Sequence, residues 1–171
     1  MVVTRRRLVA AILWLYGGTA SLSATEPQIV SVRDYGAKGD NATDDTAAFV
    51  AAIAAIDDMN AAVDIAALQS RPTLLAPAGG AYLISPINLT SNMDFLIEAG
   101  ASVVGAMDTS KYPLVPFLPS YGRGEDHPGP RYMSLIHGEH LQNVSISGRG
   151  TLDGQGFYWW DLNARGLENY T

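Results

Sequence analysis

After residue 72 the chain is a succession of short apolar segments separated by connections rich in Gly, Asn, Ser and Pro. Short runs in which apolar and polar residues alternate predict β-strands, and strands this short do not form a stable sheet in isolation. The expected strands cover residues 73–76, 81–84, 87–89, 95–97, 102–104, 134–136, 144–146 and 151–152. The fold must therefore stack many short strands on one another.

Part of this pattern repeats with a displacement of 49 residues, because Phe95, Val103 and Gly105 recur as Val144, Leu152 and Gly154. Inward apolar residues that alternate with polar ones, with a glycine at the end of each unit, are typical of a parallel β-helix. The displacement exceeds one ordinary coil, so residues 107–133, which are rich in Pro and Gly, are expected to form an inserted loop. We predict an all-β, right-handed parallel β-helix. A β-sandwich is the alternative, but it favours tight Asn-Gly hairpin turns, and none occurs between these strands.

Upstream of the repeats, residues 34–56 pass from a turn rich in Asp and Gly into a run of Ala and Ile. This segment lacks the alternating acids and final Glu of a calcium loop, and it lacks the Lys-Ser/Thr end of a phosphate loop. A short strand at 29–32, a glycine turn and a helix from about residue 46 fit it better. Thr43 or Asp44 is expected to cap this helix, with Asp44 and Asp45 near the positive end of its dipole.

Phe49, Ile53 and Ile56 follow one another at helical spacing and form one apolar stripe on the expected helix. The first coil of a stacked β-helix leaves an apolar end that another element must cover. We therefore expect the Ala-rich helix to cap this end of the solenoid.

The first residues have the organisation of a secretory signal peptide. Three arginines precede the apolar run LVAAILWLY, and small residues follow it. Cleavage after Ser23 fits best, with Ala24 as the alternative site, and an uncleaved membrane anchor remains the other interpretation. The domain organisation predicted is a signal peptide at 1–23 and one β-helical domain over 24–171, secreted to the extracellular space or cell wall, with no membrane association after cleavage. A faint twin-arginine pattern at residues 4–8 leaves bacterial export open.

The charge of the chain argues against a nucleic-acid partner. Its net charge of −6 becomes −9 when residues 1–23, which hold three Arg and no acid, are removed. The absence of cysteine excludes disulfides and Cys-ligated zinc. Four sequons mark possible N-glycosylation in a eukaryotic secretory pathway: Asn41, Asn88, Asn143 and Asn169.

Two motifs carry a family resemblance. The segment VSVRDYGAKGDNATDDTAAFVAAI, residues 30–53, resembles the N-terminal signature of pectin-degrading β-helix enzymes. The segments LPSYGRG, residues 118–124, and SLIHGEHLQNVSISGRGTLDGQGFYWW, residues 134–160, are similar to plant-type polygalacturonases of glycoside hydrolase family 28. The resemblance covers residues from about 29 to 171 and implies a pectin-lyase-type β-helix.

This resemblance implies hydrolysis of α-1,4 bonds between galacturonic acid units of pectin with inversion, by a monomer that uses aspartates and needs no metal or cofactor. The family's catalytic signatures are Asn-Thr-Asp, Asp-Asp between small residues, Gly-His-Gly and Arg-Ile-Lys, and none occurs here. The two Asp-Asp pairs, Asp44-Asp45 and Asp57-Asp58, belong to the expected N-terminal helix rather than to a later coil. We therefore assign no catalytic residue. We expect an N-terminal fragment or truncated product, incomplete at its C-terminus, that is inactive alone.

Three residues are candidates for substrate binding. Arg123 and Arg131 could pair with galacturonate carboxylates, and Trp160 could stack on a sugar ring. Each of them could equally serve packing or loop anchoring, and Asp153 is expected to hold a turn between coils. The three histidines, His127, His137 and His140, are too scattered for a metal site. A noncatalytic carbohydrate-binding β-helix, such as an adhesin or tail-spike-like module, remains the alternative function, and a pectate lyase would need a calcium cluster of acids that is not found.

Overall fold

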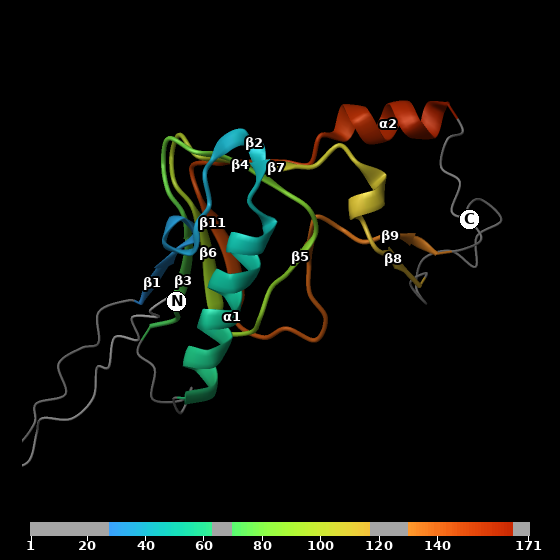
Figure 1. Ribbon diagram of the computed structural model, residues 1–171. Helices are drawn as coiled ribbons and strands as arrows, with labels where there is room; N and C mark the ends of the chain where they lie inside the picture. Colours follow the sequence, from blue (N-terminus) through green and yellow to red (C-terminus); the bar gives the residue numbers. More distant parts are fainter. Residues whose placement is uncertain (1–27, 63–69, 117–129, 166–171) are drawn as a thin grey trace, which may run out of the picture.

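The computed structural model describes residues 28–62, 70–116 and 130–165, and its strands stack in parallel from coil to coil (Figure 1). One sheet has the order β1 (Ile29–Ser31), β3 (Thr73–Ala76), β6 (Met93–Ile97) and β11 (Val144–Gly148). A second has the order β2 (Asp40–Asp44), β4 (Ala81–Ile84), β7 (Ser102–Gly105) and β12 (Thr151–Asp153). A short third side pairs β5 (Ile87–Asn88) with β10 (Ile136–His137). This arrangement is the predicted parallel β-helix.

The register shows that one coil takes 21 residues, because Thr73 pairs with Asp94 and Ala81 pairs with Ser102. The next coil is longer because the chain leaves the sheets after β7. It forms the short helix η3 (Thr109–Lys111), the strand β8 (Leu114–Val115) and the strand β9 (Arg131–Tyr132), and β8 and β9 pair antiparallel. The described part of residues 107–133 therefore lies outside the stacked sheets, as predicted for an inserted loop.

The predicted displacement of 49 residues is correct for β12, in which Leu152 pairs with Val103, but it is wrong for β11. There, Phe95 pairs with Ile146 rather than with Val144, a displacement of 51. The reason is a shorter turn. Residues 98–101 connect β6 to β7, whereas only residues 149–150 connect β11 to β12. The strand expected at 134–136 is also shifted, since β10 begins at Ile136, and the expected strand at 29–32 ends at Ser31, where the 3-10 helix η1 (Val32–Tyr35) begins.

Aromatic side chains fill the interior where the helix α1 (Thr46–Ala62) meets the sheets. The predicted stripe is confirmed, because Phe49, Ile53 and Ile56 are all buried. The Phe49 ring packs edge to face against Tyr82, with centroids 5.9 Å apart, and against Phe95 at 6.1 Å. In Figure 1, α1 runs across the front of the coil, between the sheet that contains β3 and β6 and the strand β5.

The aspartates of the first turn have more varied roles than the predicted caps. Asp44 does accept a hydrogen bond from the Thr46 amide at 3.1 Å, at the start of α1. Thr43 does not cap the helix, because its hydroxyl donates to Asp40 at 2.8 Å. The Asp45 carboxylate is buried and turns away from the helix end, where it accepts from the amides of Lys38 at 2.7 Å and Gly39 at 2.9 Å. Asp45 therefore anchors the glycine turn, a role that residue spacing alone does not reveal.

We predict that Asp45→Ala lowers the free energy of unfolding by about 3 kcal/mol, because it leaves the partly buried amides of Lys38 and Gly39 without their acceptor. Urea denaturation monitored by circular dichroism measures this loss. The matched control is Asp58→Ala on the exposed face of α1, for which the expected change is within about 0.5 kcal/mol. Equal denaturation midpoints for the two variants would show that the turn does not depend on the carboxylate.

Candidate functional site

An aromatic cluster attaches the C-terminal helix α2 (Gly156–Ala164) to the excursion between the coils. Trp159 lies at its centre, and its ring centroid is 4.7 Å from that of Tyr112, 5.3 Å from that of Tyr158 and 5.6 Å from that of Tyr132. Burial raises the pKa of the Tyr112 hydroxyl, and the neighbouring Tyr158 adds to the effect. Trp159 is thus a packing residue that joins α2, η3 and β9.

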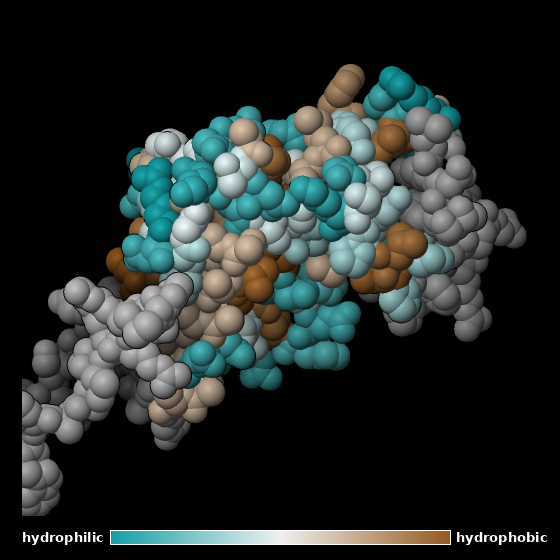
Figure 2. Space-filling view, viewed as in Figure 1, coloured by the Kyte–Doolittle hydropathy of each residue, from teal (hydrophilic) through white to brown (hydrophobic). Residues whose placement is uncertain are grey.

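The next aromatic residue, Trp160, has the opposite environment. Its residue is 74% exposed, and Phe157, three positions earlier, is 87% exposed. Residues three apart on a helix share a face, so α2 presents two apolar rings to solvent. Figure 2 shows apolar surface over the region of α2, β8 and β9 as well as beside α1. This geometry is compatible with the predicted sugar contact of Trp160, which stays a prediction.

Arg131 lies on β9 opposite Val115 and is exposed. Arg123 lies outside the described residues, and the substrate contacts of both arginines stay predictions.

A pocket of ≈ 260 Å³ opens beside this region, between the ends of β4 and β7 and the segment that includes η3. Leu83, Val104 and Ala106 contribute apolar surface to it. The polar lining residues come from three separate segments and are Asn41, Asp108, Lys111 and Gln155. Two of them, Asn41 and Gln155, have left-handed backbones, with φ of 59° and 55°.

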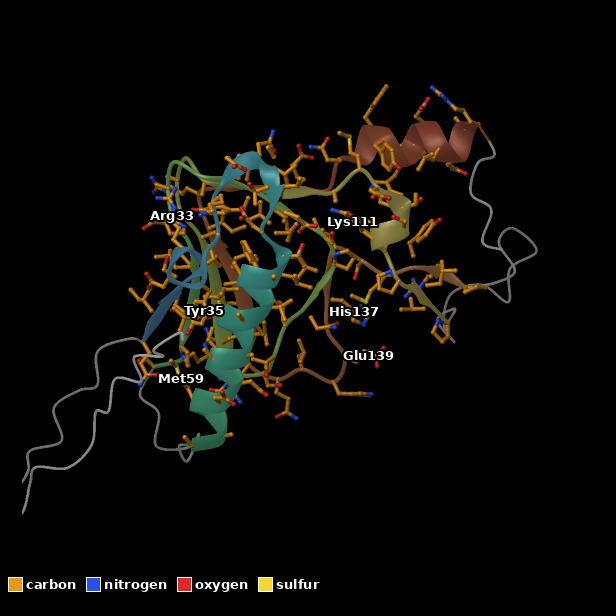
Figure 3. All side chains as sticks on the ribbon, in the orientation of Figure 1. Arg33, Tyr35, Met59, Lys111, His137 and Glu139 are labelled. Carbon is orange, nitrogen blue, oxygen red and sulfur yellow. The ribbon has the colours of Figure 1, made fainter. Side chains whose placement is uncertain are left out.

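Lys111 is held at this pocket by an ion pair with Asp44, in which the Lys111 Nζ and Asp44 Oδ2 atoms are 2.6 Å apart. Figure 3 shows the Lys111 side chain on the side of η3 that faces β2 and α1. Asp44 also accepts from the Thr46 hydroxyl at 2.5 Å, and that hydroxyl oxygen accepts from the Ser85 amide at 2.8 Å. One carboxylate therefore links η3, the start of α1 and the end of β4.

These contacts determine the charge states around the pocket. Burial opposes ionisation of Asp44, but hydrogen bonds from Lys111 and Thr46 outweigh it and hold the pKa of Asp44 below its ordinary value. The same hydrogen bond raises the pKa of Lys111. Hydrogen bonds from the Ser110 hydroxyl and amide lower the pKa of Asp108. The sequence suggested a cap role for Asp44 but not its partner, because Lys111 is 67 positions away.

The motif GRGTLDGQG is explained by coil stacking. Gly148 has a φ of 114°, and a Cβ atom there would collide with the backbone of Ile97; a Cβ at Gly150 would meet the same residue. Asp153 accepts a hydrogen bond from the Gln155 amide at 2.8 Å, which confirms the predicted turn. The motif residues therefore position α2 and Gln155 relative to the preceding coil.

The described histidines do not form a metal centre. His137 and Glu139 lie on one side of the coil (Figure 3), with the His137 Nε2 and Glu139 Oε1 atoms 3.7 Å apart. The described residues contain no group of three or more His, Asp or Glu side chains that could hold a metal ion. His127 lies outside the described residues.

The three described sequons differ in their surroundings. Asn41 and Asn88 are exposed. The Asn143 side chain is occupied, because its amide donates to Asn92 at 3.3 Å while its oxygen accepts from Arg71 at 2.9 Å. Asn169 and the signal-peptide residues lie outside the described ranges, so glycosylation and secretion stay predictions. Within those ranges, no helix is long and apolar enough to cross a bilayer.

Comparison with known proteins agrees with this architecture. Residues 29–109 match the family model described as rhamnogalacturonase A/epimerase, pectate lyase-like. A probable polygalacturonase from Vitis vinifera is 36% identical over 142 residues, which are 82% of this chain and 27% of the relative. A polygalacturonase from Malus domestica is 30% identical over 84% of this chain and 25% of the relative. The chain thus spans about a quarter of the length of these curated relatives.

Solved structures give the same result. An exopolygalacturonase from Thermotoga maritima superposes with a TM-score of 0.62 and 26% identity, covering 86% of this chain and 31% of that one. A family 28 exopolygalacturonase from Yersinia enterocolitica superposes with a TM-score of 0.57 and 28% identity, and the match covers 75% of this chain and 21% of that one. The fold and the matches define a pectate lyase-like β-helix. The chain is similar to this family over residues 29–109 and to polygalacturonases, including a family 28 enzyme, over most of its length. These relatives do not favour the noncatalytic alternative.

We predict that Asp44→Asn lowers the free energy of unfolding by about 1 kcal/mol at pH 7, because it removes the ion pair with partly exposed Lys111. The pKa of Asp44 is lower in the folded chain than its ordinary value of 3.8, so this contribution is present above about pH 4 and is lost as the pH falls through the folded value. Urea denaturation at pH 7 and near pH 2 measures it. A difference between variant and parent that is the same at both pH values would contradict the assignment, and the exposed Asp34→Asn serves as control.

Proposed function

We propose that this chain is the N-terminal part of a secreted polygalacturonase-like glycoside hydrolase that cleaves α-1,4-galacturonosyl bonds of pectin by acid/base inversion. The observation that carries the proposal is the match of the pectate lyase-like family model to residues 29–109, extended by polygalacturonase relatives over most of the chain. In an inverting mechanism, one carboxylic acid protonates the leaving oxygen, and a second carboxylate activates water on the opposite face of the sugar.

The acids of the described residues are poor candidates for these roles. A general acid needs a carboxyl group whose pKa is raised towards the working pH. Asp40 has the opposite environment, because the amides of Thr43 and Ala42 donate to it and lower its pKa to about 2. Asp44 and Asp108 are likewise shifted downward, and the buried Asp45 is committed to backbone amides.

We therefore propose that the catalytic coils are not contained in these 171 residues and that this chain alone is inactive. The absence of the four family signatures from the sequence supports this proposal. In this interpretation the chain contributes the start of the solenoid, and α1 caps its first coil. The complete enzyme, with its catalytic coils, is a secreted monomer that acts on pectic polysaccharide without a cofactor.

The activity is tested by the release of reducing ends from polygalacturonate. We expect no release by the purified 171-residue chain and clear release by a product translated from a reading frame extended downstream. Release by the 171-residue chain would overturn the prediction of inactivity. An extended product that binds polygalacturonate without cleaving it would instead support a noncatalytic carbohydrate-binding module.

The capping role of α1 predicts a strong dependence of stability on Phe49, whose ring is fully buried against Tyr82 and Phe95. Phe49→Ala should lower the free energy of unfolding by about 4 kcal/mol, since it leaves a cavity beneath the helix. Val50→Ala, at a neighbouring position that is 50% exposed, is the control and should cost less than about 1 kcal/mol. Similar losses in urea denaturation would show that α1 does not close the coil.

A further inference from the structure

An acidic sugar is expected to bind beside an unpaired cationic side chain. In the pocket lined by Asn41, Lys111 and Gln155, the lysine is already paired with Asp44. We propose that this pocket binds one neutral sugar unit of a pectic polysaccharide rather than a uronate. This inference rests on the proposed action on pectin, because it names the class of sugar that one part of the surface accepts.

The size and the lining of the pocket suit a sugar ring. Its volume of ≈ 260 Å³ lies just below the range of about 300–1,000 Å³ that is typical of ligand pockets, which limits an occupant to about a single sugar ring. The side chains of Leu83 and Val104 and the exposed side chain of Met107 supply apolar surface for the C–H groups of a pyranose. The amides of Asn41 and Gln155 offer both donors and acceptors to hydroxyl groups.

The backbone conformation determines where the side-chain amides of Asn41 and Gln155 are placed. Between the pairs Asp40–Ala81 and Asp44–Leu83, β2 has four residue steps where β4 has two, so Asn41 lies in a bulge. The side-chain amide of Asn41 makes no hydrogen bond to another described residue. Gln155 precedes α2; its backbone amide donates to Asp153 at 2.8 Å, and its side-chain nitrogen also contacts Asp153 at 3.5 Å, which leaves the side-chain oxygen for a ligand. Bulges and left-handed residues that re-aim side chains are frequent at functional sites.

The charges around the pocket disfavour a uronate. The Lys111 ammonium is already paired with Asp44 at 2.6 Å, so its charge is largely balanced before a substrate carboxylate could approach. Asp108, which also lines the pocket, is ionised at neutral pH, and the three charged groups leave a net charge of one negative unit. A galacturonate would meet this like charge, whereas a neutral sugar would not.

The test uses the 171-residue chain and ligand-observed NMR titration with four neutral sugars, D-galactose, D-xylose, L-arabinose and L-rhamnose, and with D-galacturonate. D-galactose and D-galacturonate form a matched pair that differs only at C6. We expect at least one neutral sugar to bind with a millimolar Kd that is about fivefold or more below that of galacturonate. Tighter binding of galacturonate, or no binding of any neutral sugar, would overturn the proposal.

Asn41→Gly and Gln155→Gly remove the two amides while keeping the left-handed backbone, which glycine adopts without strain. Each should raise the Kd of the neutral sugar about fivefold or more. The matched control is His140→Gly, which is also left-handed, with a φ of 54°, but does not line the pocket. Unchanged affinity in both pocket variants, with folding verified by circular dichroism, would place the sugar elsewhere.

Asp44→Asn gives an opposite readout, because it frees the Lys111 ammonium and should strengthen galacturonate binding about fivefold. An unchanged galacturonate affinity would contradict the charge argument.

The outcome of these binding tests can be distinguished from the outcome of the test of the proposed function. Loss of sugar binding in the pocket variants with hydrolysis retained in an extended product is expected for a subsite remote from the reaction. Sugar binding together with failure of an extended product to cleave polygalacturonate would overturn the proposed hydrolysis but not the pocket.

Discussion

The structure depends on the alignment of inward-facing apolar side chains from one coil to the next. Parallel pairing places Leu74 above Phe95 and Tyr82 above Val103, so that the backbone hydrogen bonds and the packed interior are specified together. Neither would suffice alone, because strands of two to five residues have too few hydrogen bonds to persist and the interior of a single coil is too small to exclude water. Stability therefore arises from the stack rather than from any one strand.

The same constraint permits long excursions. A coil needs only to return in register, and the chain leaves the stack for α1 after β2 and again for η3, β8 and β9 after β7. The Asp44–Lys111 ion pair joins the starts of the two excursions, which the five strands β3 to β7 separate in the chain. The polar pocket lies where they approach one another, so its lining comes from the least regular parts of the fold. This placement agrees with the general tendency of binding residues to occupy loops on a rigid scaffold.

Several features could be predicted because they depend on local chemistry. The helical stripe of Phe49, Ile53 and Ile56 and the alternation within β3 and β4 follow from residue periodicity, and both have the expected buried positions. Phe95 pairs with Ile146, two residues beyond the predicted partner Val144. The length of the turn sets this register, and the periodicity of the strands does not predict turn length. Asp45 was expected at the helix end, yet its carboxylate binds amides that precede it in the chain.

The sequence by itself determined the class of fold and the family resemblance, because repeated short strands and glycine-rich turns are properties of consecutive residues. It also determined that the known acid signatures of the family are absent from these 171 residues. Only the tertiary structure decided which charges neutralise one another and which polar groups share a pocket. Asn41, Lys111 and Gln155 are far apart in the chain, and coil stacking brings them together through contacts that no local pattern encodes.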